Sequence, residues 1–115
     1  MTSLLSVIET RAYLADAERL MSEDERSKLV DAIAAAPEAG VVIRGTNGLR
    51  KMRIPLRGRG KRGGGRVIYW YHSDGYPAVL LTVFAKNEAS DLTAEQRRRF
   101  AAIGAAIIDQ LGARR

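Results

Sequence analysis

Nine basic side chains and no acidic one lie between residues 44 and 66, and this run is the part of the chain best suited to chemistry. Its members are Arg44, Arg50, Lys51, Arg53, Arg57, Arg59, Lys61, Arg62 and Arg66. Seven of the nine are arginines, and the planar guanidinium group presents five donors that suit phosphate oxygens. A run of scattered lysines would often be only a solvated face. Like charges at this density repel unless an anion neutralises them, so the run predicts a polyanionic partner, nucleic acid first.

The rest of the composition indicates one globular domain over residues 1–115. Residues 1–43 carry a net charge of −4, residues 44–66 of +9 and residues 67–115 of +1. With 46% hydrophobic and 28% charged residues, the composition is close to the globular average. The absence of cysteine excludes disulfides, cysteine-based zinc sites and thiol catalysis. No apolar run approaches the ~20 residues of a membrane-spanning helix, and no signal-peptide pattern opens the chain. These features predict a soluble cytoplasmic protein with no membrane partner.

Motifs that would indicate a bound cofactor or metal are missing from the sequence. The glycines between residues 58 and 65 are not followed by the Gly-Lys-Ser/Thr of a phosphate-binding loop, and no dinucleotide fingerprint is found. His72 is the only histidine, which excludes paired-histidine catalysis. We interpret it as a residue at a strand end rather than a catalyst. The carboxylates show no metal-ligand spacing, so we expect no cofactor and no metal.

Hydrophobic periodicity predicts the elements that must position the basic residues. Leu4–Thr10 fits a short strand and Arg11–Met21 a helix. The capping-box pair Ser22 and Glu25 opens a second helix, which Pro37 ends.

Three β-rich runs follow, at Leu49–Ile54, Arg66–His72 and Pro77–Lys86, and the apolar Val41–Arg44 before them could also be extended. A second capping box, Thr93 with Gln96, opens a last helix. The apolar stripe predicted for that helix consists of Phe100, Ile103, Ala106, Ile107 and Leu111. The order β-α-α-β-β-β-α predicts an α+β fold with helices packed on a small, mainly antiparallel sheet.

Four basic residues from three predicted strands are expected to meet at one end of that sheet. Lys51 and Arg53 share a face of their strand because they lie two residues apart. Arg66 begins the next strand, and Lys86 ends the one after. If these strands are neighbours, the four cations converge. Taken alone, the basic residues of the strand at 49–54 would be interpreted as the solvated side of an edge strand.

Three stretches of the chain resemble a known family. They are G-L-R-K-M-R (48–53), G-R-G-K-R-G-G-G-R-V-I-Y (58–69) and L-L-T-V-F-A-K-N-E-A-S-D-L-T (80–93). In this order they resemble the RelE/HigB-like toxins of bacterial type II toxin–antitoxin systems, and most closely the HigB-type branch. The resemblance implies a RelE/ParE-like fold.

The resemblance also implies an activity, a location and partners. Such toxins are cytoplasmic endoribonucleases that cut mRNA in the ribosomal A site without a metal, by attack of the nucleotide's own 2′-hydroxyl on the adjacent phosphate. The implied partners are the ribosome with its mRNA and a cognate antitoxin, here HigA-like with a helix-turn-helix DNA-binding domain.

By position, the resemblance assigns catalytic roles to Lys51, Arg53, Arg66 and Lys86. We expect RNA contacts from Arg50, Arg57, Arg59, Lys61, Arg62 and Asn87. The chain departs from the family pattern at two positions, since Asn87 replaces an arginine and Thr93 replaces a tyrosine. The general acid and base are therefore not assigned.

Two other functions remain open on the sequence alone. The same fold serves toxins that inhibit DNA gyrase without catalysis, although Lys51, Arg53 and Arg66 argue against that reading. The basic run would also serve a simple RNA- or ribosome-binding module.

Overall fold

The computed structural model describes residues 5–46, 48–56, 64–72, 75–86, 89 and 91–113. The elements in chain order are β1 (Val7–Glu9), α1 (Arg11–Leu20), α2 (Glu23–Ala35), β2 (Val41–Val42), β3 (Leu49–Ile54), β4 (Gly65–Trp70), β5 (Ala78–Ala85) and α3 (Ala94–Ala113). The strands of this described part form one sheet in the order β1-β5-β4-β3-β2. Only β1 and β5 pair in parallel, and the other neighbours are antiparallel. The predicted α+β fold with a mainly antiparallel sheet is confirmed, and β2 is added to the predicted order.

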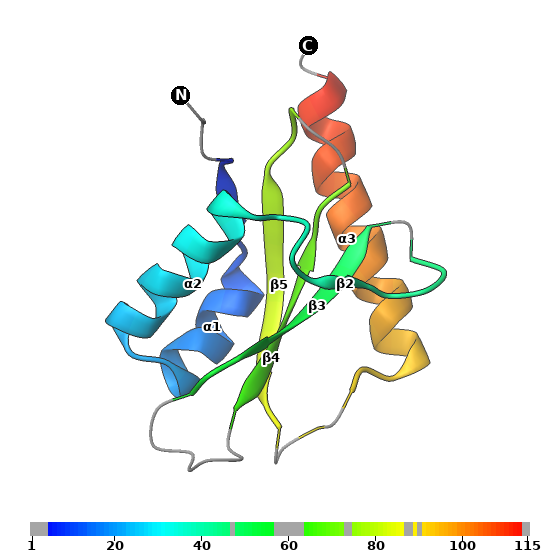
Figure 1. The fold of residues 1–115 in the computed structure, drawn as a ribbon. Coiled ribbons are helices and arrows are strands. Elements are labelled where there is room, and N and C mark those ends of the chain that lie inside the picture. The colour runs from blue at the N-terminus through cyan, green and yellow to red at the C-terminus, as the bar shows by residue number, and fades with distance from the viewer. Residues whose placement is uncertain are drawn as a thin grey trace.

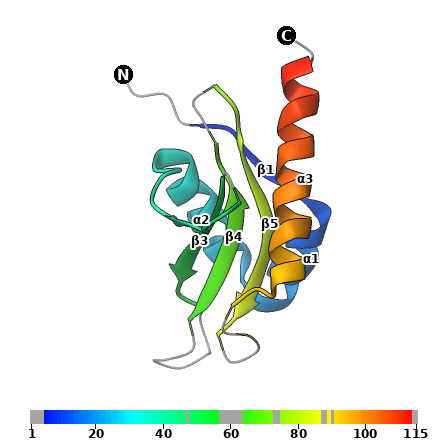
Figure 2. The same ribbon diagram turned by 90° about the vertical axis from the view of Figure 1, so that its right-hand side faces the viewer.

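The sheet separates two helical layers (Figures 1 and 2). On one face, α1 and α2 pack Tyr13 and Ile33 against Tyr69 and other buried residues of β4 and β5. On the other face, α3 packs Phe100 and its neighbours against a second cluster that includes Trp70. Since both faces are covered, the strand β5 is apolar almost throughout.

Side-chain caps fix the helix starts that the sequence predicts. The Thr10 hydroxyl accepts a hydrogen bond from the Tyr13 N–H and donates one to the Leu80 carbonyl, which ties the start of α1 to β5. The Ser22–Glu25 capping box is present at α2. Before α3, the Thr93 N–H donates to Gln96 Oε1 at 2.9 Å, and the Gln96 N–H donates to Thr93 Oγ1 at 3.1 Å.

The predicted stripe of α3 is wrong at two of its five positions. Ile103 is 40% exposed and Ala106 is also exposed. The helix instead approaches the sheet at buried Gly104, where a Cβ atom would lie 2.6 Å from Trp70 Cγ. Because the Trp70 ring occupies the space of a side chain at 104, the contact face is rotated toward Gly104. Within the described part of the chain, no helix is long and apolar enough to cross a membrane.

The pairing of β4 with β5 contains a bulge near its middle. Tyr69 lies opposite Leu80 and Ile68 opposite Thr82, so Leu81 has no partner. Beyond the bulge, regular pairing continues to the end of the strand, and the Lys86 N–H donates to the Gly64 carbonyl at 3.0 Å.

Candidate active site

Two arginines lie directly opposite each other where β3 ends and β4 begins. The register pairs Arg53 with Arg66, and side chains so paired have Cβ atoms about 5 Å apart on one face. Paired like charges destabilise a sheet. Among the described residues, no carboxylate lies within ion-pair distance of either guanidinium group. The pair therefore forms a position where an anion would be stabilised.

The other two predicted catalytic residues lie near this arginine pair. Lys51 precedes Arg53 by two residues on the same face, opposite Ile68. Lys86 directly follows β5, which ends at the same end of the sheet (Figure 1). The three strands that carry these positions are neighbours in the sheet, as the expected convergence requires. Their catalytic roles stay predictions.

Lys51 has an acidic partner that the sequence interpretation missed. Its Nζ lies 3.3 Å from Asp91 Oδ2, and Asp91 Oδ1 accepts a hydrogen bond of 2.8 Å from the Leu92 N–H. This backbone hydrogen bond, helped by Lys51 and by the charge of Arg97, holds the pKa of Asp91 below its ordinary value. The carboxylate is therefore charged at neutral pH. Asp91 belongs to the S-D-L-T motif at residues 90–93, from which the sequence predicts only the start of the last helix, at Thr93.

The side chain of Arg50 contacts backbone carbonyls and an aromatic ring of the fold. Its Nη1 donates to the carbonyls of Glu38 and Gly40 at 3.1 and 2.9 Å, and its guanidinium carbon lies 5.9 Å from the centroid of the Tyr71 ring. By strand alternation it faces the side opposite Lys51 and Arg53. The RNA contact expected from Arg50 stays a prediction, whereas these contacts hold the segment before β2 against β3.

His72 lies far from the arginine pair along β4. Trp70 is paired with Leu49, at the end of β4 opposite to Arg66, and exposed His72 stacks on the Trp70 ring with centroids 6.4 Å apart. This position agrees with the interpretation of His72 as a strand-end residue.

Five of the predicted RNA-binding residues belong to segments other than those that the structure describes. Arg57, Arg59, Lys61, Arg62 and Asn87 lie outside the described residues. Within the described ranges, no three histidine, aspartate or glutamate side chains gather as a metal site would require.

Comparison with known proteins identifies the family. Residues 10–113 match the family described as the RelE toxin of the RelE/RelB toxin–antitoxin system. The chain belongs to the RelE toxin family. The fold agrees with this membership, because the structure of a mutant of the E. coli toxin RelE in the free state is similar with a TM-score of 0.56. That similarity covers 88% of this chain and 96% of the other at 14% sequence identity, so by itself it shows the fold alone.

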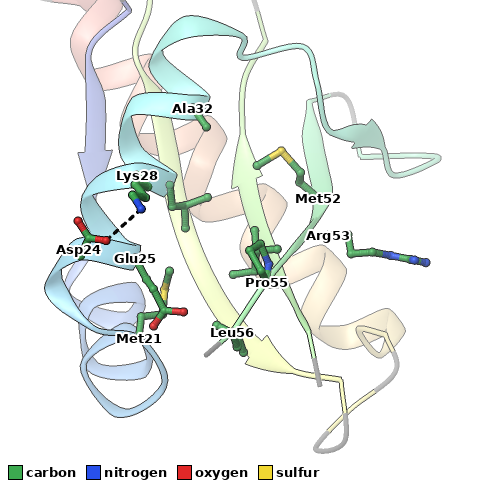
Figure 3. A pocket seen from close by; sticks show the side chains of 11 residues that line it. Met21, Asp24, Glu25, Lys28, Ala32, Met52, Arg53, Pro55 and Leu56 are labelled. Carbon is green, nitrogen blue, oxygen red and sulfur yellow. Dashed lines mark ion pairs between the residues drawn. The ribbon is translucent and has the colours of Figure 1, made fainter. Parts of the chain in front are cut away.

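This RelE-family toxin has a second surface feature on its other face. A groove of about 520 Å³ lies between α2 and the end of β3 (Figure 3). Apolar side chains lining it include Met21, Leu29, Ala32, Met52, Pro55 and Leu56. Asp24 and Glu25 add acidic groups to the lining, and Asp24 pairs with Lys28 at 3.1 Å. Arg53 also belongs to the lining at the end of β3, although its side chain extends away from α2 (Figure 3).

Proposed function

We propose that the chain is a ribosome-dependent mRNA endonuclease of the HigB-type branch that cuts mRNA in the A site. The observation that carries this proposal is the cross-strand pair of Arg53 and Arg66, two cations placed side by side without an acidic partner among the described residues. A phosphodiester is the anion that such a pair suits, since each guanidinium group can donate two parallel hydrogen bonds to phosphate oxygens. Membership of the RelE toxin family supports the same conclusion.

The proposed reaction is transesterification without a metal. The 2′-hydroxyl of one nucleotide attacks the phosphorus of the next linkage, and the bond to the 5′-oxygen breaks, which leaves a 2′,3′-cyclic phosphate and a 5′-hydroxyl. Extra negative charge develops on the phosphoryl oxygens in the transition state. Arg53 and Arg66 would stabilise that charge, and preorganised donors of this kind usually contribute the largest part of such catalysis. Lys51 and Lys86 would supply further positive charge or move the protons.

The predicted RNA contacts extend this surface. Arg57, Arg59, Lys61 and Arg62 belong to the segment that joins β3 to β4, next to the arginine pair in the chain. We propose that they bind ribosomal or messenger RNA phosphates, which would give affinity without sequence preference.

The test of this function is to map cuts on a translated message. With programmed ribosomes, purified toxin is expected to cut within the A-site codon and to leave 2′,3′-cyclic phosphate ends. The same message without ribosomes should remain whole. Binding without cuts would favour a simple RNA- or ribosome-binding module, and inhibition of DNA gyrase without cuts would favour the non-catalytic toxin.

Membership of the family implies an antitoxin as a partner, because the RelE toxin belongs to a toxin–antitoxin system. We propose that this antitoxin is HigA-like and that it binds the helical half of the chain, whose residues 1–43 carry a net charge of −4. The groove between α2 and β3 supports this choice, because most of its lining is apolar. An antitoxin bound at the α2 side of this groove would block entry into the ribosome by its bulk, and it would leave Arg66 and the outward-extending side chain of Arg53 accessible to RNA.

A competition titration distinguishes an antitoxin that keeps the toxin out of the ribosome by its bulk (bulk exclusion) from one that covers the RNA-binding site directly. The preformed complex is expected to bind a short mimic of A-site RNA as tightly as the free toxin does, yet to fail to enter ribosomes. Ala32→Glu, in the groove, should weaken antitoxin binding, and Ala15→Glu on exposed α1 is the matched control. If RNA and antitoxin compete for one site, bulk exclusion is wrong.

A further inference from the structure

The Asp91 carboxylate connects two elements that are distant in sequence. Its Oδ2 accepts a hydrogen bond from Lys51 on β3, 40 residues away, and its Oδ1 accepts one from the Leu92 N–H immediately before α3. Both oxygens are therefore used, and the position of the Lys51 ammonium group depends on where α3 begins.

The start of α3 is itself well anchored. Leu92, next to Asp91, is 7% exposed and belongs to the core cluster beneath α3. The following residue, Thr93, is fixed by its reciprocal hydrogen bonds with Gln96. Asp91 is thus attached to a rigid segment, which is what a side chain needs to hold another in place.

Lys51, by contrast, has no such rigidity of its own. A lysine carries its charge on a flexible four-carbon stem, and the side chain of Lys51 is 40% exposed. Without a partner, its ammonium group would sample many positions over the face of the sheet. The bond to Asp91 restricts the ammonium group to positions near the start of α3, on the face of the sheet that also carries Arg53 and Arg66.

We propose that Asp91 is a positioning residue for the cleavage reaction, which holds the Lys51 ammonium group in place beside Arg53 and Arg66 before the RNA phosphate binds. This inference rests on the proposed endonuclease function. It gives the aspartate of the S-D-L-T motif a role beyond the start of the helix. The stability of the fold is not the reason for the pair, because an ion pair with partners 40% and 46% exposed contributes little to folding.

The first test is Asp91→Asn, which keeps the size of the side chain and an acceptor for the Leu92 N–H but removes the charge. We expect the single-turnover rate of cleavage on programmed ribosomes to fall by about ten- to a hundredfold, as for a misplaced catalytic group. Ribosome affinity and the thermal midpoint of unfolding should stay close to those of the unchanged protein. Asp91→Glu should restore part of the rate. Asp109→Asn, an exposed residue on α3, is the control for the same change of net charge.

The second test asks whether Asp91 acts through Lys51. In a Lys51→Gln background, Asp91→Asn should cause no further loss of rate, because the group that Asp91 positions is already gone. An unchanged rate in Asp91→Asn, or an equal loss in both backgrounds, would overturn the inference while the endonuclease function stands. If the unchanged protein cuts no message in this assay, the endonuclease function itself is wrong, and the inference falls with it.

Discussion

Replacement of Arg66 by alanine is expected to lower the rate of mRNA cleavage by about a hundredfold or more, which is the typical cost of losing one preorganised donor to the developing charge. Arg66 lies opposite Arg53, and its side chain is only partly buried, with one hydrogen bond to the Gly65 carbonyl. Little packing depends on it, so the fold should remain intact. Cleavage is measured under single-turnover conditions on programmed ribosomes, with thermal unfolding as a check of the fold.

Two further variants make the Arg66 result specific. Arg66→Lys keeps the charge but loses the planar pair of donors, so it should retain only part of the activity. Arg98→Ala removes an exposed arginine on α3 and should cleave normally. Full activity in Arg66→Ala would show that the assignment of the site to the arginine pair is wrong.

Gly104→Val is expected to produce the largest loss of stability among the changes considered. The added Cβ would lie 2.6 Å from Trp70 Cγ and 2.7 Å from Trp70 Cβ, so α3 or the buried indole ring must move. Such overpacking typically costs about 1–3 kcal/mol in the free energy of unfolding. Valine is a better helix former than glycine, but this offsets only a few tenths of a kcal/mol, roughly. Urea unfolding, with the slope compared as well as the midpoint, measures the change.

The control for Gly104→Val is a neighbouring position on the same helix. Ala106 is exposed, so Ala106→Val should cost about half a kcal/mol from helix propensity alone. Equal losses in the two variants would mean that α3 is not seated on Trp70 through Gly104.

The strand faces could be predicted from the sequence where the alternation is regular. In β3 the alternation that places Lys51 and Arg53 on one face also separates Met52 and Ile54, which pack in the cluster beneath α1 and α2, from Leu49, which packs in the cluster beneath α3. In α3 the prediction failed because it counted apolar side chains, whereas the closest approach to the sheet is made by Gly104, which has none. The position at which α3 needs a residue without a side chain is determined by the size of Trp70, which lies on β4.

The candidate site was only partly predictable for a similar reason. The basic residues are visible in the sequence, and their convergence followed from a plausible order of strands. The pairing of Arg53 with Arg66 depends on the register of β3 and β4, which alternation alone does not determine. Asp91 was missed because its partner lies 40 residues away, on a strand whose distance from α3 only the folded chain defines.

Because of the bulge at Leu81, the number of residues in β5 determines the face of the sheet on which Lys86 lies. Before the bulge, Val79 is paired with Trp70 on the face of the sheet that α3 covers. If the alternation continued without a break, the odd-numbered residues of β5 would all lie on that face. The extra residue reverses the alternation, so that even-numbered residues lie on the α3 face after the bulge. Phe84 therefore lies opposite Arg66, and Lys86, two residues later, lies on the same face as Phe84. Loss of a single residue at this point would turn Lys86 toward the α1–α2 side although every basic residue was retained. A relative could thus lose the site by a deletion that an inventory of its charged residues would never reveal.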